Sequence, residues 1–326
     1  MAFLGFTEVI KHLPFIKKVR KTLKQAIIDN KINTVILIDY PGFNLNFAAQ
    51  IKELNVKIIY YISPQLWAWG EKRITKIKKL IDKVIVLFPF EEEFYKQHNV
   101  DVAYSGHPLI ERIEEYNFIP KDKFFEDHNL DPDKKILLVM PGSRLQEIDK
   151  IFPQTIKAAN KIKEKFNMQI VVACSSNINE NLFSKFNNET EFKLIKGHTY
   201  ELLKYSYFGI IKSGTSTLEA ALFELPFIVV YSTSLITYYI GRMLIKIKNI
   251  ALVNIVAQEN IVYELIQHDV NQENIFNKCS YYLNNYTNYL EIKKNLSKLK
   301  HKLGNSGASA NAAKVIFNTV NEIKKA

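Results

Sequence analysis

Two short segments place glycine and hydroxyl side chains where a strand should give way to a helix. The first follows the apolar run at 208–211 and consists of Ser213, Gly214, Thr215, Ser216 and Thr217. Glycine allows a ligand close to the main chain, and the free N–H groups of a helix start attract phosphate. Glu219 lies one turn into the expected helix, where its carboxylate could accept the two hydroxyl protons of a ribose. A simple helix cap followed by a surface glutamate fits the same residues.

A second segment of this kind lies between the apolar run at 136–140 and a helix expected after Glu147. It consists of Pro141, Gly142, Ser143 and Arg144. The arginine could form a bidentate, charge-assisted pair with a diphosphate, although a surface arginine beside a helix start is the alternative. Because both segments lie at strand ends in one half of the chain, together they favour a ligand that carries phosphate.

The acidic residue Asp39 follows the apolar run at 35–38 and precedes Tyr40, Pro41 and Gly42. In a parallel sheet the carboxyl ends of the strands face the ligand. A carboxylate there could act as the general base that takes a proton from an acceptor hydroxyl. Its position is equally compatible with capping of the next helix.

Both tryptophans of the chain, Trp67 and Trp69, lie in one segment with Ser63 and Gln65. These side chains could line a pocket for a sugar or an acyl chain, although packing against a sheet is the commoner fate of indoles. Arg73 follows on a basic helix that could meet lipid headgroups or an acceptor phosphate, or could simply face solvent. The other cations of this helix are Lys72, Lys76, Lys78 and Lys79.

One histidine, His107, lies between Gly106 and Pro108 after a short apolar run. It could contact a ligand, or it could be a loop histidine without a role. The remaining histidines form no ligand cluster, and Cys174 and Cys279 belong to no metal-ligand spacing. No metal or other cofactor is therefore expected.

Alternating strands and helices must position these residues. The first series has apolar runs at 35–38, 57–62, 84–88 and 102–104, with helices expected near 15–27, 45–54 and 72–81. After a polar stretch at 111–135, the second series has runs at 136–140, 169–173, 192–195, 208–211 and 227–231. Helices are expected there at 152–166 and 218–224, and a closing helix at 308–325. Such alternation predicts βαβ units and parallel sheets.

The predicted fold class is thus α/β, with two Rossmann-like, doubly wound domains that face a cleft. We expect an N-terminal domain at 1–120, a C-terminal domain at 121–305 and a terminal helix at 306–326. Ligands of such folds bind at the carboxyl ends of the strands. The cleft should therefore hold the reacting groups.

Composition limits the class of protein. The chain has 326 residues, a formal net charge of +11 and 47% hydrophobic residues, which excludes disorder, a collagen-like fibre and a disulfide-stapled miniprotein. The charge allows nucleic acid, an anionic membrane or a phosphorylated small molecule as partner and does not choose among them. The apolar stretch at 235–256 is interrupted by cations, and the first residues lack a secretory signal pattern. We expect a cytoplasmic location.

Several sequence blocks together resemble the lipid-A-disaccharide synthase family, which are inverting glycosyltransferases of the GT-B fold. The blocks occur in the family's order over most of the chain: DYPGFN (39–44), YISPQLWAWGEKR (61–73), LFPFEEEFY (87–95), SGHPL (105–109), PGSRLQEI (141–148), SGTSTLEAAL (213–222) and LVNIVA (252–257). SPQLWAW followed by FPFE is specific to this family, whereas GTSTLE is shared with other GT-B enzymes.

The resemblance implies transfer of 2,3-diacylglucosamine from its UDP donor to 2,3-diacylglucosamine 1-phosphate, forming the β-1,6 lipid A disaccharide 1-phosphate and UDP. Asp39 matches the family's essential aspartate and would activate the acceptor 6-hydroxyl. Arg144 and the turn at 214–217 would hold the diphosphate, with Glu219 on the ribose and Asn254 near the uridine. The resemblance also implies peripheral contact with the inner face of the cytoplasmic membrane, a homodimer with exchanged C-terminal segments, and no metal or nucleic-acid partner.

Two departures from the family pattern affect this expectation. The family begins with a strand and a glycine-rich loop that this sequence lacks, so we predict an incomplete first domain whose run at 35–38 exposes backbone and apolar surface. Residues 258–260 read Gln-Glu-Asn where the family usually has Gly-Arg-Glu, which removes a positive charge near the donor. The alternatives are a non-catalytic remnant that binds a nucleotide sugar or a membrane, and another UDP-sugar GT-B enzyme. Examples of the latter are the peptidoglycan N-acetylglucosaminyltransferase and a UDP-sugar 2-epimerase, both disfavoured by SPQLWAW.

Overall fold

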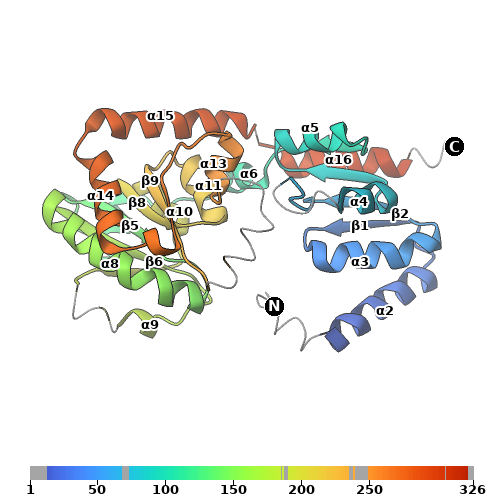
Figure 1. Cartoon of the computed structure of the whole chain (residues 1–326), viewed down its shortest axis with the longest axis horizontal. Coiled ribbons are helices and arrows are strands. Elements are labelled where there is room, and N and C mark those ends of the chain that lie inside the picture. Colours follow the sequence, from blue (N-terminus) through green and yellow to red (C-terminus); the bar gives the residue numbers. More distant parts are fainter. Residues whose placement is uncertain are drawn as a thin grey trace. The chain divides into compact units, whose positions relative to one another are not determined.

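The computed structural model describes residues 13–67, 73–184, 186, 190–234, 238, 249–304 and 306–321. The chain divides into two compact units, Met1–Pro108 with Asn305–Ala326 and Leu109–Gly304 (Figure 1). Each unit contains its own parallel sheet, which confirms the predicted α/β class.

The first unit is built on a four-stranded parallel sheet in the order β1-β2-β3-β4. Its strands are β1 (Thr34–Ile38), β2 (Lys57–Tyr61), β3 (Lys83–Val86) and β4 (Val102–Tyr104). Its helical segments are α2 (Leu13–Asp29), α3 (Pro41–Ile51), η1 (Lys52–Leu54), α4 (Ile74–Leu80), α5 (Pro89–Gln97) and α16 (Ala308–Asn321). The strands coincide closely with the predicted apolar runs.

Both faces of this sheet are covered, as parallel sheets require. On one face Ile58 and Tyr60 pack with the helices of the core, whereas Ile59 and Ile85 on the other face pack against Ala312 of α16. The edge strand β1 is different, because Ile36 and Ile38 remain 44% and 56% exposed. The expected exposure of apolar surface along the run at 35–38 is therefore confirmed.

The second unit holds a six-stranded parallel sheet in the order β10-β9-β8-β5-β6-β7. Its strands are β5 (Lys135–Met140), β6 (Met168–Cys174), β7 (Lys193–Lys196), β8 (Phe208–Lys212), β9 (Phe227–Tyr231) and β10 (Glu264–Ile266). The order turns back between β5 and β8, which pair directly along Met140 and Ile211. In doubly wound sheets this point of reversal is where ligands bind.

Helices flank this sheet, and the long helix α8 shows why they form. Its buried residues recur at helical spacing and are Ile148, Ile151, Phe152, Thr155, Ile156, Ala158, Ala159 and Ile162. The other helical segments of the unit are α6 (Pro108–Glu114), α7 (Lys121–Asp127), α9 (Asn181–Ser184), α10 (Thr199–Tyr205), α11 (Thr215–Leu222), α13 (Leu252–Ala257), η3 (Gln267–Asp269), α14 (Gln272–Leu283) and α15 (Tyr286–Lys302).

The division between the units differs from the predicted domains. The boundary falls after Pro108 rather than after residue 120, because the polar stretch at 111–135 contains anchors for the second unit. Tyr116 donates a hydrogen bond to Glu201 and packs its ring against Tyr200. The closing helix α16 is likewise not separate, since Lys57 donates to the main-chain carbonyl of Thr319 and the helix belongs to the first unit.

Candidate active site

The point of reversal in the second sheet carries both predicted phosphate-suited turns. Residues 141–144 follow β5, residues 213–217 follow β8, and these two strands are neighbours. The turns line one cavity of about 460 Å³, together with residues that follow β6 and β7. The cavity residues are Met140, Gly142, Ser143, Arg144, Ala173, Cys174, Ser175, Ser176, Gly197, Thr199, Lys212, Ser213, Gly214, Thr215, Ser216 and Glu219. The structure thus brings the two turns into one site.

Local geometry at these turns favours an anion. Helix α8 begins after Arg144 and helix α11 begins after Gly214, so that two helix starts face the cavity. Gly142 has φ 122°, and a Cβ there would lie 2.5 Å from the Oε2 atom of Glu147. A residue with a side chain does not fit this turn. Thr217 turns its hydroxyl back to the carbonyl of Gly214 at 2.8 Å, which fixes the second turn.

The carboxylate of Glu147, which follows the first turn, pairs with two cations that line the cavity. The Oε1 atom of Glu147 accepts hydrogen bonds from Arg144 and from Lys212, each at 2.8 Å. Burial works to raise the pKa of this carboxyl, but the two cations outweigh it and hold the pKa below its usual value. Neither Glu147 nor Lys212 was predicted as a site residue. The lysine in the block Lys212-Ser213-Gly214 was a usable signal, because it ends the strand that carries the second turn.

Glu219 lines the same cavity from the second turn of α11, one turn into the helix as its spacing predicted. Burial raises the pKa of this carboxyl, and the nearby guanidinium of Arg112 partly offsets the effect. Arg112 itself lies over the ring of Tyr200, 5.7 Å from the centroid. Glu219 is therefore a half-buried hydrogen-bond acceptor at the edge of an otherwise cationic site.

Asp39 lies in the first unit, in a turn of unusual main-chain conformation directly after β1. Asp39 and Tyr40 have φ 48° and 42°, a left-handed conformation that non-glycine residues adopt rarely. Asn44 on α3 donates its side-chain amide to the carbonyl of Asp39 at 2.7 Å and to that of Ile38 at 3.0 Å. The Asp39 side chain is exposed. Strain of this kind is common where a side chain is held for a function.

The segment after β2 is anchored to the start of α5 through Trp67. The indole N–H of Trp67 donates to Glu91 at 3.0 Å, and its ring meets that of Phe90 edge-on. Glu91 is 3% exposed and also accepts from the main-chain N–H groups of Phe88 and Leu87. Burial raises the pKa of Glu91 to about 7, against the opposing effect of these hydrogen bonds. These contacts of Trp67 are with side chains of α5, whereas the structural alternative expected packing against a sheet.

Of the other predicted pocket residues of the first unit, Ser63 and His107 contact Tyr95 of α5 and Phe88 just before it. Ser63 is buried beside Tyr95, and Gln65 is half-buried. His107 packs against the ring of Phe88, and burial lowers the pKa of its imidazole to about 4. Arg73 is exposed at the start of α4. Trp69 lies outside the described residues.

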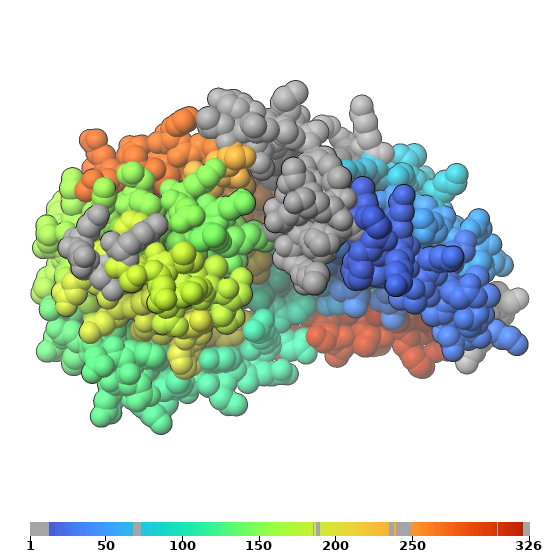
Figure 2. All heavy atoms as spheres, turned by 90° about the horizontal axis from the view of Figure 1, so that it is seen from below, coloured from blue at the N-terminus to red at the C-terminus, as the bar shows by residue number. Residues whose placement is uncertain are grey.

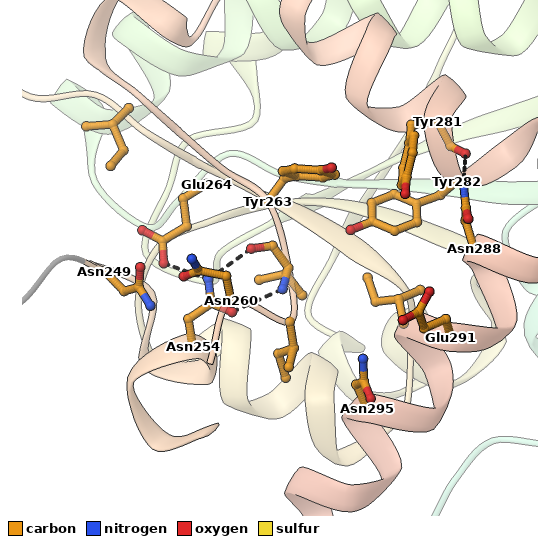
Figure 3. A pocket seen from close by; sticks show the side chains of 14 residues that line it. Asn249, Asn254, Asn260, Tyr263, Glu264, Tyr281, Tyr282, Asn288, Glu291 and Asn295 are labelled. Atoms are coloured by element: carbon orange, nitrogen blue, oxygen red, sulfur yellow. Dashed lines mark hydrogen bonds between the residues drawn. The ribbon is translucent and has the colours of Figure 1, made fainter. Parts of the chain in front are cut away.

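Asn254 is not brought to the cavity that holds the other predicted donor residues. It is fully buried and lines a different pocket, of about 470 Å³, with Tyr263, Tyr281 and Tyr282 (Figure 3). Its amide N–H groups donate to Val262 and Glu264, and its Oδ1 accepts from the N–H of Val262. Both polar atoms of its side chain therefore hold the segment that enters β10.

Among the described residues, no group of three or more His, Cys, Asp or Glu side chains could hold a metal ion. Likewise, within the described ranges there is no helix with the length and apolar character needed to cross a membrane.

Comparison with known proteins shows the family to which the chain belongs. A family model described as lipid-A-disaccharide synthetase matches residues 1–320. A lipid-A-disaccharide synthase of Coxiella burnetii (strain CbuG_Q212) is 35% identical over 321 residues, covering 98% of this chain and 85% of the relative. One from Geobacter sulfurreducens is 34% identical over 320 residues, covering 97% and 83%.

Solved structures show the same fold at low identity. The S. aureus MnaA–UDP co-structure matches with a TM-score of 0.67 and 15% identity, covering 98% of this chain and 83% of that one. The UDP-GlcNAc 2-epimerase from Neisseria meningitidis bound to UDP-GlcNAc matches with a TM-score of 0.65 and 13% identity, covering 97% and 82%.

Two Rossmann-like units, with an anion-suited cavity at the strand-order reversal of the second, place the chain in the GT-B fold class. Within this class, the chain belongs to the lipid-A-disaccharide synthetase family of glycosyltransferases.

Proposed function

We propose that the chain transfers 2,3-diacylglucosamine from UDP-2,3-diacylglucosamine to the 6-hydroxyl of 2,3-diacylglucosamine 1-phosphate with inversion. The products are the β-1,6-linked lipid A disaccharide 1-phosphate and UDP. Family membership supports the substrates. The observation that carries the donor side is the cavity at β5 and β8, with its two helix starts and two cations.

The donor binds in this proposal with its diphosphate between the turns at 141–144 and 213–217. Arg144 offers a bidentate guanidinium. The main-chain N–H groups at the start of α11 add hydrogen-bond donors that do not titrate. Glu219 accepts from the ribose hydroxyls. These donors stabilise the negative charge that develops on the departing diphosphate, which is the largest barrier-lowering effect available to such a site.

Asp39 acts as the general base. Its carboxylate takes the proton of the acceptor 6-hydroxyl, the oxygen attacks the anomeric carbon of the donor, and the bond from that carbon to the diphosphate oxygen breaks. Its exposed side chain and its fixed main chain support this role. Ser63, Gln65, Trp67, Trp69, Arg73 and His107 form the acceptor pocket in the proposal.

The decisive experiment follows disaccharide formation from the two purified substrates. Asp39→Asn should lower turnover by about 10²- to 10⁴-fold, the usual contribution of a general base. Asparagine tolerates the left-handed conformation, so the fold and UDP binding should stay intact. Asp29→Asn, another exposed aspartate of the first unit, is the control and should be fully active. UDP binding without any product from the unmodified chain would instead indicate a non-catalytic remnant.

Peripheral contact with an anionic membrane is the second part of the proposal, because both substrates carry acyl chains. Helix α2, which is blue in Figure 2, lies on the surface of the first unit and exposes Leu13 and Phe15 beside Lys17 and Lys18. Each lysine near an anionic membrane surface contributes about 1 kcal/mol to the free energy of membrane binding.

Co-sedimentation with phosphatidylglycerol and phosphatidylcholine vesicles tests this contact. The chain should bind the anionic vesicles selectively, and Lys17→Glu with Lys18→Glu should lower the bound fraction at least tenfold. The pair Lys150→Glu with Lys157→Glu on α8 changes the net charge equally and should have little effect. Equal loss in both pairs would mean that only the overall charge matters.

Exchange of the C-terminal helix between two copies also remains a proposal. Light scattering measures the mass directly, and a monomer at micromolar concentration would argue against exchange.

A further inference from the structure

Lys212 occupies a position between the two turns of the donor cavity. Its Nζ atom lies 2.8 Å from Glu147, which follows the first turn. The same atom would lie 3.8 Å from a Cβ at Gly214 in the second turn. The side chain is only 14% exposed, yet it lines the cavity. A lysine stem that is enclosed to this degree presents its ammonium group at one defined place.

Glu147 holds Lys212 and Arg144 at the same time from outside the cavity lining. Both cations donate to its Oε1 atom, and its Oε2 atom accepts from the N–H of Ser143 at 3.2 Å. An ammonium group has three N–H donors and a guanidinium has five, so one bond from each to Glu147 leaves donors for a ligand. Two cations against one carboxylate also leave a net positive charge at the turn.

We propose that Lys212 is a second diphosphate-binding cation of the donor site and that Glu147 is a positioning residue that orients Lys212 and Arg144 toward it. This inference rests on the proposed function. The ligand class is a nucleoside diphosphate, since two cations and two helix starts around one cavity match two phosphoryl groups rather than one. Lys212 binds as a point charge beside the planar, bidentate Arg144.

Calorimetric titration of the full chain with UDP and with uridine tests the role of Lys212. Lys212→Met should weaken UDP binding about 10- to 100-fold, as expected for losing a charged hydrogen bond. Uridine binding should change less than about twofold, since uridine lacks the phosphates that Lys212 would contact. Lys212→Arg should recover most of the lost affinity. Lys163→Met on α8, whose lysine pairs with Glu191, is the charge-matched control and should leave both affinities unchanged.

A purely structural lysine gives a different result. It would lower the melting temperature of Lys212→Met while UDP and uridine lose affinity equally or not at all, and either outcome overturns the proposal. Lys212→Gln, which can still donate to Glu147, serves the same comparison if the methionine variant fails to fold. Absence of UDP binding by the unmodified chain would overturn the donor site itself, whereas equal UDP binding by both proteins overturns only the role of Lys212.

The positioning role of Glu147 is tested by combining variants. With Glu147→Gln present, Lys212→Met should weaken UDP binding less than about threefold, because an unanchored lysine has already lost most of its benefit. An undiminished 10- to 100-fold effect in that background would show that Lys212 needs no anchor and would overturn this part of the inference.

Discussion

The phenol of Tyr60 on β2 donates a hydrogen bond of 2.6 Å to the main-chain carbonyl of Asp39 at the end of β1. The same carbonyl accepts from the side-chain amide of Asn44 on α3. Two donors from different elements therefore hold a residue whose φ of 48° is unfavourable. Strained conformations persist only where the surroundings determine them in this way.

Tyr60→Phe should remove one of these two hydrogen bonds to Asp39 without removing the packing of the ring. We expect a loss of about 1 kcal/mol in the free energy of unfolding, the usual net value of one hydrogen bond. Turnover should fall several-fold because Asp39 is less well held, while UDP affinity stays constant because the donor site lies in the other unit. Denaturant titration and steady-state kinetics measure the two effects. A stability loss without any change in turnover would show that this hydrogen bond does not contribute to catalysis.

Arg144→Lys tests whether the guanidinium geometry of the donor turn matters. Lysine keeps the charge but cannot form two parallel hydrogen bonds to a phosphate, so UDP should bind roughly tenfold more weakly. The Arg144 side chain is 47% exposed, and its loss should hardly change the melting temperature. Lys135→Arg is a suitable control for exchanging lysine and arginine, because it lies in the same unit but at the other end of β5. Unchanged UDP affinity in Arg144→Lys would mean that charge alone is recognised.

Buried Glu91 should make stability depend on pH. Its folded-state pKa of about 7 lies above the usual 4.5, so the folded protein binds more protons than the unfolded chain between these values. The free energy of unfolding should therefore fall as pH rises from about 4.5 to 7, by up to about 3 kcal/mol from this group. Above pH 7 the contribution should be constant.

Glu91→Gln removes the titrating group and should flatten that decline. Denaturant titrations of both proteins at pH 5 and pH 8 give the comparison. The amide cannot accept as many hydrogen bonds from Trp67, Phe88 and Leu87, so the variant should be less stable at both pH values. Parallel pH profiles of the two proteins would show that other groups cause the dependence.

Much of the fold could be predicted because strands buried on both faces appear in the sequence as unbroken apolar runs. The strand β10 was not predicted, since Glu264, Leu265 and Ile266 form no such run and the strand is short. The predicted boundary after residue 120 also differs from the division after Pro108. Polar composition at 111–135 suggested a linker, whereas Tyr116 and a few neighbours suffice to anchor it to the second unit.

The site was predictable where one segment carries its own chemistry. The turn at 213–217 and Arg144 each follow a strand, and parallel strands present their carboxyl ends on one side. That β5 lies beside β8, however, depends on strand order, which apolar runs do not encode. The contact between Glu147 and Lys212 depends on that order, so the sequence alone does not pair the two residues, although Lys212 is recognisable as the end of the strand that carries the second turn. Glu91 was hidden similarly, because its partner Trp67 comes from another loop.

Asn254 provides the sharpest contrast between a role predicted by resemblance and a role supported by geometry. Asn254→Ala would leave the carbonyl of Val262, the N–H of Val262 and one oxygen of Glu264 without the amide that they contact. Buried groups that lose a partner cost about 1–3 kcal/mol each, so the unfolding free energy should drop by roughly 3 kcal/mol or more. UDP affinity should change little, because Asn254 does not line the donor cavity. The opposite pattern, weaker UDP binding at unchanged stability, would restore Asn254 to the uridine site and require the segment before β10 to rearrange when the donor binds.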